Sequence, residues 1–385
     1  MTTSDSAAIP VIMDVDTGID DAFALLYAAR SPRIDLLGVS CVDGNTTVDN
    51  VVSNTLTVLD AAGATDVPVA RGAQRPLLAD PCYADLFHGR DGLGDLGLSR
   101  STRDPDPRHA VAFLRETILG SPRPAVLIAT GPLTNLALLV RTHPEVRENL
   151  ARIVVMAGAI GPGNATALAE FNAWHDPEAA AIVFGFDVPL TMYGLDVFRD
   201  VVLTPGQCEA LERSAAPGAG LAARLARFDT SGAGASARAE DGDYAGGGVV
   251  ASVDADADSG PSAGAGAGAG ADRVSDAGAG LDADSAQAAG AGFGATAAEP
   301  FVTCLGDYGA VAVAADPSHC TIEHRSVLVL TSAGVGRGQT VVDRRPPGTV
   351  AEGDAGLAGG RKIDVVTAID AAHYADHWLR TLIEG

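Results

Sequence analysis

The sequence predicts an α/β protein with an open, mostly parallel sheet, helices on both faces of the sheet, and a low-complexity insertion. Over the first two-thirds of the 385 residues, short apolar runs alternate with helical patterns, as in sheets that are covered on both faces. Hydrophobic residues make up 47% of the chain and charged residues 19%, so a large core can form. Residues 230–299 break the alternation, because they contain 23 Ala and 16 Gly.

The predicted strands are short, nearly continuous apolar runs at residues 10–15, 34–42, 67–70, 125–129, 153–157 and 189–193. Between them lie apolar patterns of helical period, at residues 20–30, 48–62, 108–119, 133–141 and 177–184. In parallel sheets of this kind, ligands bind at the carboxyl ends of the strands. The residues directly after each strand are therefore the candidate functional residues.

The segment 230–299 is predicted to be a disordered or loosely ordered insertion. It contains 11 acidic residues, two arginines and almost no large apolar side chains, so it cannot bury enough surface to offset the entropy of ordering. A silk-like stack of Gly-Ala strands is the alternative, which the interspersed Asp residues disfavour. We therefore expect one core in two parts, residues 1–229 and 300–385, with the insertion between them.

The charge and composition of the chain exclude some classes of partner and indicate its location. The formal net charge is −23, and an acidic surface repels nucleic acid and anionic membranes, so we expect neither as a partner. No apolar run reaches the length of a membrane span, and the start of the chain lacks a signal-peptide pattern. Five widely spaced cysteines without a Cys-x-x-Cys pair suit reduced thiols. These features predict a soluble, cytoplasmic protein.

A group of four carboxylates lies at the end of the first predicted strand: Asp14, Asp16, Asp20 and Asp21. Asp20 and Asp21 could complement the dipole at the start of the following helix, but Asp14 and Asp16 extend the strand into its exit turn. Crowded like charges are costly unless a cation lies among them, and carboxylates are usual ligands of hard divalent ions. The pattern therefore predicts a metal site.

Two known loops share the pattern Asp-x-Asp after an apolar strand. It resembles the nucleophile loop of haloacid-dehalogenase-type phosphohydrolases, which need a lysine to hold the phosphoryl group. Lys362 is the only lysine of the chain and lies near its C-terminus, which disfavours that chemistry. The second resemblance, to the inosine–uridine-preferring nucleoside hydrolase family, extends over the whole segment Asp14-Val15-Asp16-Thr17-Gly18-Ile19-Asp20-Asp21.

Further motifs similar to those of the nucleoside hydrolase family follow in the family's order. They are Val42-Asp43-Gly44-Asn45, His88-Gly89-Arg90-Asp91-Gly92-Leu93-Gly94, Thr130-Gly131-Pro132-Leu133-Thr134-Asn135-Leu136, Met156-Ala157-Gly158-Ala159, Gly163-Asn164-Ala165-Thr166, Ala169-Glu170-Phe171-Asn172, Asp176-Pro177-Glu178, Gly194-Leu195-Asp196 and Gly306-Asp307-Tyr308-Gly309. The resemblance covers nearly all of the chain outside 230–299. Each motif alone is weakly specific, whereas the ordered series is strongly specific.

The resemblance implies an N-ribosyl hydrolase with one calcium ion and no organic cofactor. The calcium ligands would be the carboxylates of Asp16, Asp21 and Asp307 and the backbone carbonyl of Thr130. Asp16 would also act as the general base, taking a proton from the calcium-bound water that attacks the anomeric carbon. The implied substrate-binding residues are Asp20, Asn45, His88, Met156, Asn164, Glu170 and Asn172.

Most of these residues have an implied place on the ribose. The 2′- and 3′-hydroxyls would be bound by Asp20, Asn45, Asn172 and Asp307. Asn164 and Glu170 would bind the 5′-hydroxyl, and Met156 would pack against the sugar. Two nearby polar residues are interpreted as structural instead. Asn135 is a helix-start or packing residue, and Asp176, which precedes a proline, is a helix N-cap.

Two departures from the family concern the leaving base. Many members have a histidine directly before the last metal-binding Asp, whereas this chain has Gly306. The alternatives for activating the leaving group are His88, an aromatic group, or a base that leaves without a strong acid. A histidine introduced at position 306 is expected to raise activity on inosine more than on a substrate with a p-nitrophenyl leaving group, which needs no acid. The insertion replaces the segment that closes over the base in the family, so the identity of the base is not predicted.

We expect hydrolysis of the N-glycosidic bond of a ribonucleoside to ribose and free base. The alternative is a calcium-dependent ribosyl-binding or regulatory module with little or no turnover, which the missing histidine at position 306 would permit. Release of free ribose from nucleosides separates these two functions. The sequence leaves open whether the chain forms a homo-oligomer, either a dimer or a tetramer.

Replacing residues 230–299 by a short Gly-Ser linker should leave the melting temperature nearly unchanged, because the segment has few large apolar side chains to contribute to a core. Calorimetry of the full and shortened chains measures this difference. Unfolding or precipitation of the shortened chain would show that the segment belongs to the core.

Overall fold

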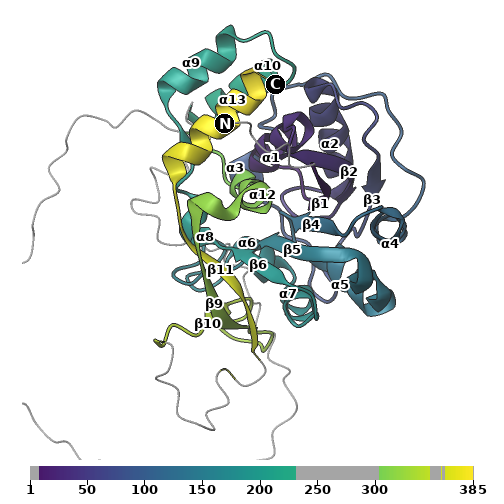
Figure 1. Ribbon diagram of the computed structural model, residues 1–385, viewed down its shortest axis with the longest axis vertical. Coiled ribbons are helices and arrows are strands. Elements are labelled where there is room, and N and C mark those ends of the chain that lie inside the picture. Colours follow the sequence, from purple (N-terminus) through teal and green to yellow (C-terminus); the bar gives the residue numbers. More distant parts are fainter. Residues whose placement is uncertain (1–7, 231–302, 347–356, 358–359, 385) are drawn as a thin grey trace, which may run out of the picture. The chain divides into compact units, whose positions relative to one another are not determined.

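Figure 1 shows the computed structural model of the chain, which describes residues 8–230, 303–346, 357 and 360–384. Within these residues, a nine-stranded, mostly parallel open sheet carries helices on both faces, which confirms the predicted fold class. The strand order is β10-β9-β11-β6-β5-β4-β1-β2-β3. The predicted insertion lies outside the described residues apart from its first residue, so its disorder stays a prediction.

The strands of this sheet are β1 (Ile9–Val15), β2 (Ile34–Cys41), β3 (Val69–Arg71), β4 (Ala125–Ala129), β5 (Leu150–Met156), β6 (Leu190–Tyr193), β9 (Cys320–Val329), β10 (Thr340–Val342) and β11 (Arg361–Ile369). The first six correspond to the predicted strands. The sequence did not predict β9 or β11, because charged side chains interrupt their apolar runs where the strands are exposed. Two further short strands, β7 (Val202–Leu203) and β8 (Thr303–Cys304), pair with each other in an antiparallel manner.

Helices connect the strands and form the outer layers. They are α1 (Ile19–Arg30), α2 (Val48–Ala62), α3 (Asp85–His88), α4 (Ala110–Gly120), α5 (Thr134–Thr142), η1 (Pro144–Asn149), α6 (Phe171–His175), α7 (Pro177–Phe184), α8 (Leu195–Phe198), α9 (Pro205–Arg213), α10 (Ala219–Thr230), α12 (Tyr308–Ala315), η2 (Pro317–His319) and α13 (Ala371–Glu384). The five predicted helices correspond to α1, α2, α4, α5 and α7. Among the described residues, none of these helices combines the length and the apolar composition needed to cross a bilayer.

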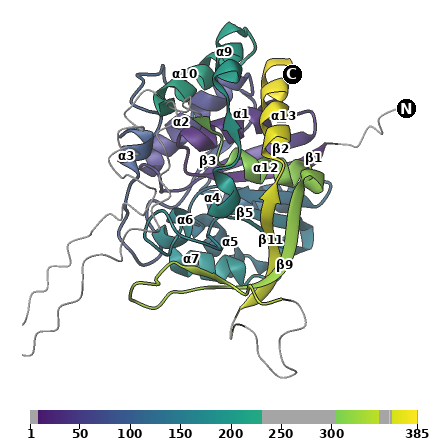
Figure 2. The same cartoon turned by 90° about the vertical axis from the view of Figure 1, so that its left-hand side faces the viewer.

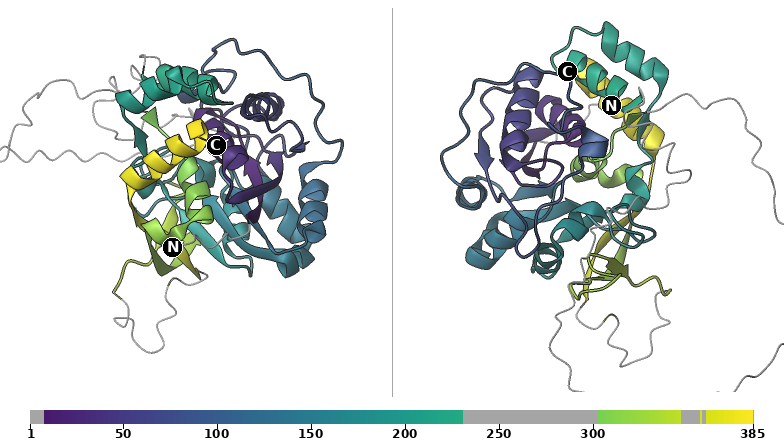
Figure 3. Two further views of the ribbon diagram at one scale, coloured as in Figure 1. Left: turned by 45° about the horizontal axis from the view of Figure 1, so that its top comes forward. Right: turned by 180° about the vertical axis from the view of Figure 1, so that it is seen from behind.

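The central strand β1 connects the two layers of the core. It pairs in parallel with β2 on one side and β4 on the other. Its side chains alternate, so that Val11 and Met13 pack with α1, α2, α12 and α13, whereas Ile12 packs with α4, α5 and α7 on the opposite face. Figures 2 and 3 show these helices from further directions. Because both faces are covered, a ligand can reach the sheet mainly at the strand ends.

Helix α12 brings the last part of the chain to the start of α1. Residues 308–314 of this helix are buried, and the ring of Tyr308 lies edge-on to that of Tyr27, with 4.7 Å between the ring centroids. Gly309 approaches strand β6 so closely that an added Cβ would lie 2.0 Å from the phenol oxygen of Tyr193. This packing sets the position of Asp307, which directly precedes the helix.

Substituting Gly309→Ala should lower the free energy of unfolding by about 1–3 kcal/mol, because the added methyl group overpacks the contact with Tyr193. The matched control is Gly220→Ala in α10, where no heavy atom lies within 4 Å of the added Cβ. That variant should be neutral, or more stable by up to about 1 kcal/mol. Urea unfolding measures both. Equal stabilities of the two variants would contradict the close approach.

Candidate active site

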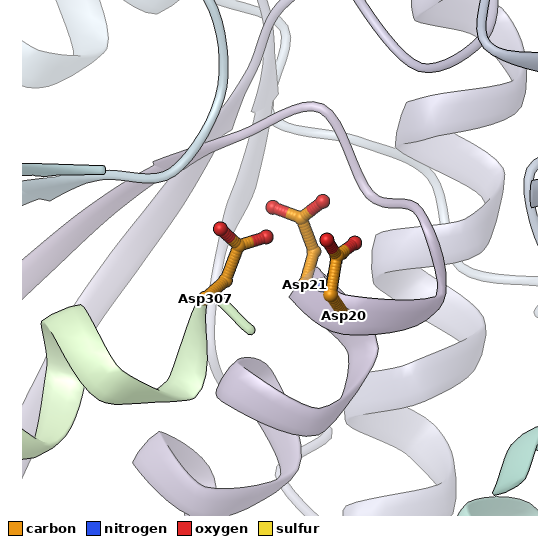
Figure 4. Close-up of side chains that lie close together, drawn as sticks. All are labelled: Asp20, Asp21 and Asp307. Atoms are coloured by element: carbon orange, nitrogen blue, oxygen red, sulfur yellow. Dashed lines mark hydrogen bonds between the residues drawn. The ribbon is translucent and has the colours of Figure 1, made fainter. Parts of the chain in front are cut away.

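Three carboxylates come together at the starts of two helices. Asp20 and Asp21 lie in the first turn of α1, and Asp307 directly precedes α12. One oxygen from each of the three lies within 4.8 Å of the others, and Figure 4 shows these carboxylates grouped at the two helix starts. Asp21 and Asp307 are buried, and Asp20 is partly exposed. Residues from the first and the last part of the chain thus form one acidic cluster.

The carboxylate of Asp21 accepts hydrogen bonds from residues that follow two different strands. Its Oδ2 accepts a hydrogen bond of 2.9 Å from the backbone N–H of Gly18, in the turn after β1. Its Oδ1 accepts a hydrogen bond of 2.7 Å from the hydroxyl of Thr130, directly after β4. The structure therefore brings Thr130 to the cluster, as the sequence predicted, but the contact that it forms is through the side chain. Its carbonyl oxygen accepts a hydrogen bond from Asn172.

Asp16 is buried beside this cluster, between two glycines. The backbone N–H of Asn45 donates to its Oδ2 at 2.8 Å, whereas its Oδ1 accepts no hydrogen bond from the described residues. A Cβ on Gly44 would lie 2.1 Å from Oδ2, and a Cβ on Gly131 would lie 2.9 Å from Oδ1. Only glycine lets the loops after β2 and β4 approach the carboxylate so closely. Asp16 is consequently fixed, with one oxygen left for a ligand.

The carboxylates of the cluster raise the pKa values of one another. Burial, and next the charge of Asp20, raises the pKa of Asp21 to about 6. The pKa of Asp16 is raised well above its usual value, first by burial and then by Asp21. For Asp307, burial acts first, followed by the charges of Asp20, Asp21 and Asp16. A set of crowded, buried carboxylate oxygens, one of them without a hydrogen bond, fits a hard divalent cation.

Asp14, near the end of β1, is buried and is joined to neighbouring segments by hydrogen bonds. Its Oδ1 accepts hydrogen bonds from the Ser40 hydroxyl at 2.5 Å and from the Asn135 amide at 2.8 Å, and burial raises its pKa to about 7. Asn135 also donates to the carbonyl of Cys41 and accepts from the N–H of Ala73. Its amide is therefore engaged in joining loops, which agrees with its interpretation as a structural residue.

The predicted ribose-binding residues after β5 lie on and before helix α6. The side-chain amide of Asn172 donates to the carbonyl oxygens of Thr130 and Met156, at 2.7 and 2.9 Å. Glu170 caps the helix by accepting hydrogen bonds from the N–H groups of Asn172 and Ala173, and it also accepts one from the N–H of Gly158 in the loop after β5. Burial raises its pKa to about 7. Asn164 accepts from the N–H of Phe171. The sequence did not predict this capping role of Glu170, although a carboxylate before a short helix is a recognisable cap pattern.

His88 lies at the edge of the acidic cluster. Its Nδ1 accepts a hydrogen bond of 3.2 Å from the N–H of Ile19 and lies 3.9 Å from an oxygen of Asp20. Because Nδ1 is an acceptor in this contact, the proton of the neutral ring resides on Nε2, which then is a donor. The imidazole is only partly exposed. The structure thus places His88, which the resemblance implies as a substrate-binding residue, beside Asp20.

Position 306 cannot carry a side chain in the present arrangement. Gly306 has φ +44°, and an added Cβ would lie 2.4 Å from the ring of Phe198 and 3.0 Å from Cβ of Asp20. The ring of Phe198, at the end of α8, lies where a side chain at position 306 would extend. The expected gain in inosine hydrolysis from a histidine at position 306 stays a prediction, and it requires the ring of Phe198 to move. No sequence pattern could have indicated this contact, because positions 198 and 306 are 108 apart along the chain.

The chain matches the inosine-uridine preferring nucleoside hydrolase family over residues 11–249, which is more than half of its length. The chain therefore belongs to this family, and the resemblance found in its motifs is confirmed. The match includes the carboxylates after β1, His88, Thr130 and the α6 residues. Asp307 lies beyond the matched range and joins the cluster through the fold.

Relatives and solved structures agree with this membership. The pyrimidine-specific ribonucleoside hydrolase RihA of Citrobacter koseri is 41% identical over 221 residues, which are 57% of this chain and 71% of that protein. RihA of an Enterobacter species is 42% identical over the same shares. The plant nucleoside hydrolase PpNRh1 has the same fold, with a TM-score of 0.76, 24% identity, and coverage of 98% of this chain and 99% of its own. For the purine-preferring ribonucleoside hydrolase from Gardnerella vaginalis, the TM-score is 0.73, the identity 24%, and the coverage 97% and 98%.

Substituting Gly306→Ala should destabilise the chain by more than about 2 kcal/mol, because a positive φ and the contact with Phe198 act together. Gly97→Ala is the matched control, since Gly97 has φ +58° and no heavy atom within 4 Å of an added Cβ. It should cost only about 1–2 kcal/mol. Combining Gly306→Ala with Phe198→Ala should recover part of the loss. Urea unfolding tests the series, and an additive double variant would contradict the steric explanation.

Proposed function

We propose that this protein hydrolyses the N-glycosidic bond of ribonucleosides to ribose and free base. The observation that carries the proposal is the buried acidic cluster at the strand ends of a chain that belongs to the nucleoside hydrolase family. The names of the RihA relatives, at 41% and 42% identity, support a ribonucleoside as the substrate. Their pyrimidine specificity makes uridine and cytidine the first substrates to test.

The metal ligands that we propose are the carboxylates of Asp16, Asp21 and Asp307 and the carbonyl of Thr130, with calcium as the ion. The all-oxygen donor set supports a hard cation. Asp20, proposed at the ribose hydroxyls, has an oxygen within 4.8 Å of those of Asp21 and Asp307, so it lies beside the same ion. When bound, the cation would supply a water molecule that has a lowered pKa and a defined position.

Asp16 is the proposed general base. The N–H of Asn45 holds its Oδ2, so its Oδ1 is the oxygen that can take a proton from the attacking water. Cleavage of the glycosidic bond passes through an oxocarbenium-like transition state, in which positive charge develops on the ribosyl ring. The carboxylates of the cluster stabilise that charge without having to reorient, because hydrogen bonds already fix Asp16 and Asp21.

The remaining predicted residues surround the ribose in this proposal. The 2′- and 3′-hydroxyls are bound by Asp20, Asn45, Asn172 and Asp307. The 5′-hydroxyl is bound by Asn164 and Glu170, and Met156, buried at the end of β5, packs against the sugar. The hydrogen bonds that hold Asn172 and Glu170 to backbone groups support this arrangement, since they orient both side chains before substrate binds.

The leaving base is proposed to receive its proton from His88. Position 306 has no side chain, and the imidazole of His88 lies at the edge of the acidic cluster, with Nδ1 accepting a hydrogen bond from Ile19 at 3.2 Å and lying 3.9 Å from Asp20. The alternative function, a calcium-dependent ribosyl-binding or regulatory module, is favoured by the same absence of a donor at position 306. Turnover distinguishes the two.

Cellular context and assembly are also proposals. We propose a cytoplasmic role in nucleoside salvage, which the free thiols of the five cysteines support. We also propose a single core formed by residues 1–229 and 300–385, with 230–299 inserted, because β11 pairs in parallel with β6 and in antiparallel manner with β9. We further propose a homo-oligomer, either a dimer or a tetramer, and the molar mass from light scattering tests this.

Release of ribose from uridine, cytidine, inosine and adenosine tests the function. Substituting Asp16→Asn should lower kcat by about 10²–10⁴-fold with an unchanged melting temperature, because an amide accepts no proton from the water. Asp35→Asn, an exposed change on the neighbouring strand β2, should have no effect. Ligand binding by the wild-type chain without release of ribose from any nucleoside would instead support the binding module.

The metal-free chain should be more stable at about pH 5 than at about pH 8. The pKa values of Asp14, Asp21 and Glu170 are raised to about 7, 6 and 7, so the stabilisation from their protonated forms is complete below about pH 4 and is lost as the pH rises through 6 to 7. Calcium binds the ionised carboxylates and should raise the melting temperature more at pH 8 than at pH 5.

Thermal unfolding with chelator and with added calcium measures this dependence. Asp21→Ala should abolish the calcium-induced rise together with turnover. Full activity in excess chelator would exclude the calcium assignment, and a metal-free chain that is most stable at pH 8 would contradict the role of the buried carboxylates.

A further inference from the structure

A buried histidine and a buried aspartate face each other beside the site without a hydrogen bond. Nε2 of His175 lies 3.4 Å from Oδ2 of Asp43, and the side chain of each residue is 1% exposed. Within the described residues, neither ring nitrogen of His175 has a hydrogen-bond partner, nor does Oδ2 of Asp43. His175 ends helix α6, and Asp43 follows strand β2. Neither residue has a part in the chemistry proposed above.

The contact crosses the middle of the site. In the sheet, β2 is separated by β1 and β4 from β5, the strand that leads to α6. A contact between the loop after β2 and helix α6 must therefore pass over the carboxyl ends of β1 and β4. Those ends carry Asp16 and Thr130, the proposed base and a proposed metal ligand.

Each member of the pair is connected to one of these two groups. Asp43 is two residues from Asn45, whose backbone N–H donates to Asp16 at 2.8 Å. His175 lies one helical turn after Asn172, whose amide donates to the carbonyl of Thr130 at 2.7 Å. A shift of either segment would therefore move a hydrogen-bond donor of the catalytic cluster. The contact between Asp43 and His175 lies between the loop after β2 and helix α6 and sets the distance between them.

Stability alone does not account for the pair. Two groups that can carry charge lose their hydration when buried, and apolar residues of similar volume in their place are often neutral or stabilising. On the side of His175 the contacts are apolar, with the ring of Phe171 5.5 Å from that of His175 and Ala173 fully buried on the same helix, whereas Asp43 interacts with the hydroxyl of Tyr83. A contact between two polar groups depends on their orientation and on the identity of the partner, whereas apolar packing does not. Such a contact can therefore fix the position of one segment against the other.

We propose that Asp43 and His175 are positioning residues, which fix the loop after β2 against helix α6 and thereby hold Asp16 and Thr130 at their places in the cluster. The turnover arm of the test rests on the proposed hydrolase function. An arm based on hydrogen exchange does not.

The test compares Asp43→Ala, His175→Val and the double variant Asp43→Ala/His175→Val, each as the full chain loaded with calcium. Either single variant leaves one polar group buried alone, so both should lose stability. The double variant should regain a melting temperature near that of the wild type. If the pair positions the cluster, kcat should fall about tenfold or more in all three variants, with KM within about twofold. The double variant should lose no more activity than the single variants, because one contact is removed in each case.

The matched control is Asn149→Ala. Asn149 joins two segments through partly buried hydrogen bonds to the carbonyls of Ile118 and Ser121, but it does so before β5 and β4 begin, at the opposite end of the strands. This variant should lose stability while kcat stays within about twofold of the wild type. A double variant of the pair with wild-type kcat would overturn the proposal, because it would reduce the pair to a packing contact.

Amide hydrogen exchange gives a readout that needs no turnover. In the double variant, the N–H of Asn45 should exchange at least tenfold faster than in the wild type, since its alignment with Asp16 is no longer held. Asn149→Ala should leave that rate unchanged. Unchanged exchange in the double variant would overturn the proposal even for a chain that releases no ribose, whereas absence of ribose release from the wild type would overturn only the hydrolase function.

Discussion

The repulsion among buried carboxylates at the carboxyl ends of the central strands is the constraint on which the rest of the site depends. Asp16, Asp21 and Asp307 have pKa values raised by burial and by neighbouring negative charge. The fold keeps them together with donors that are already in place, namely the N–H groups of Gly18 and Asn45 and the hydroxyl of Thr130. A cation completes such a site, because it supplies the positive charge that these neutral donors lack.

The parallel sheet makes this crowding possible. β1 lies between β2 and β4, so the loops after all three strands end at one edge of the sheet. Gly44 and Gly131 let two of these loops approach Asp16 more closely than any side chain would allow. Helix α12 then delivers Asp307 from the last part of the chain, and its tight packing on Tyr193 leaves that carboxylate little freedom.

The region around position 306 links this framework to the leaving base. The ring of Phe198 and the positive φ of Gly306 make the absence of a side chain there a packed feature of the fold. In the proposed mechanism the proton for the base comes from His88, whose Nδ1 accepts a hydrogen bond from the N–H of Ile19. Asp43 and His175 lie 3.4 Å apart beside the cluster, and we propose that their contact connects its two sides.

The sequence by itself determined the features that local pattern encodes. An apolar run followed by acidic residues predicted β1 and the carboxylates Asp14 to Asp21. Asp176, which precedes Pro177, was predicted to be a helix N-cap, and its Oδ1 accepts a hydrogen bond from the N–H of Ala179. The ordered motifs identified the family. Only the tertiary structure decided which distant residues meet. The family resemblance had implied that Asp307 joins the acids after β1, whereas the contact of Phe198 with position 306 and that of His175 with Asp43 depend on the order of strands in the sheet. Sequence periodicity reports the environment of each segment within a few turns, whereas contacts between segments follow from how the crossover connections place one strand beside another.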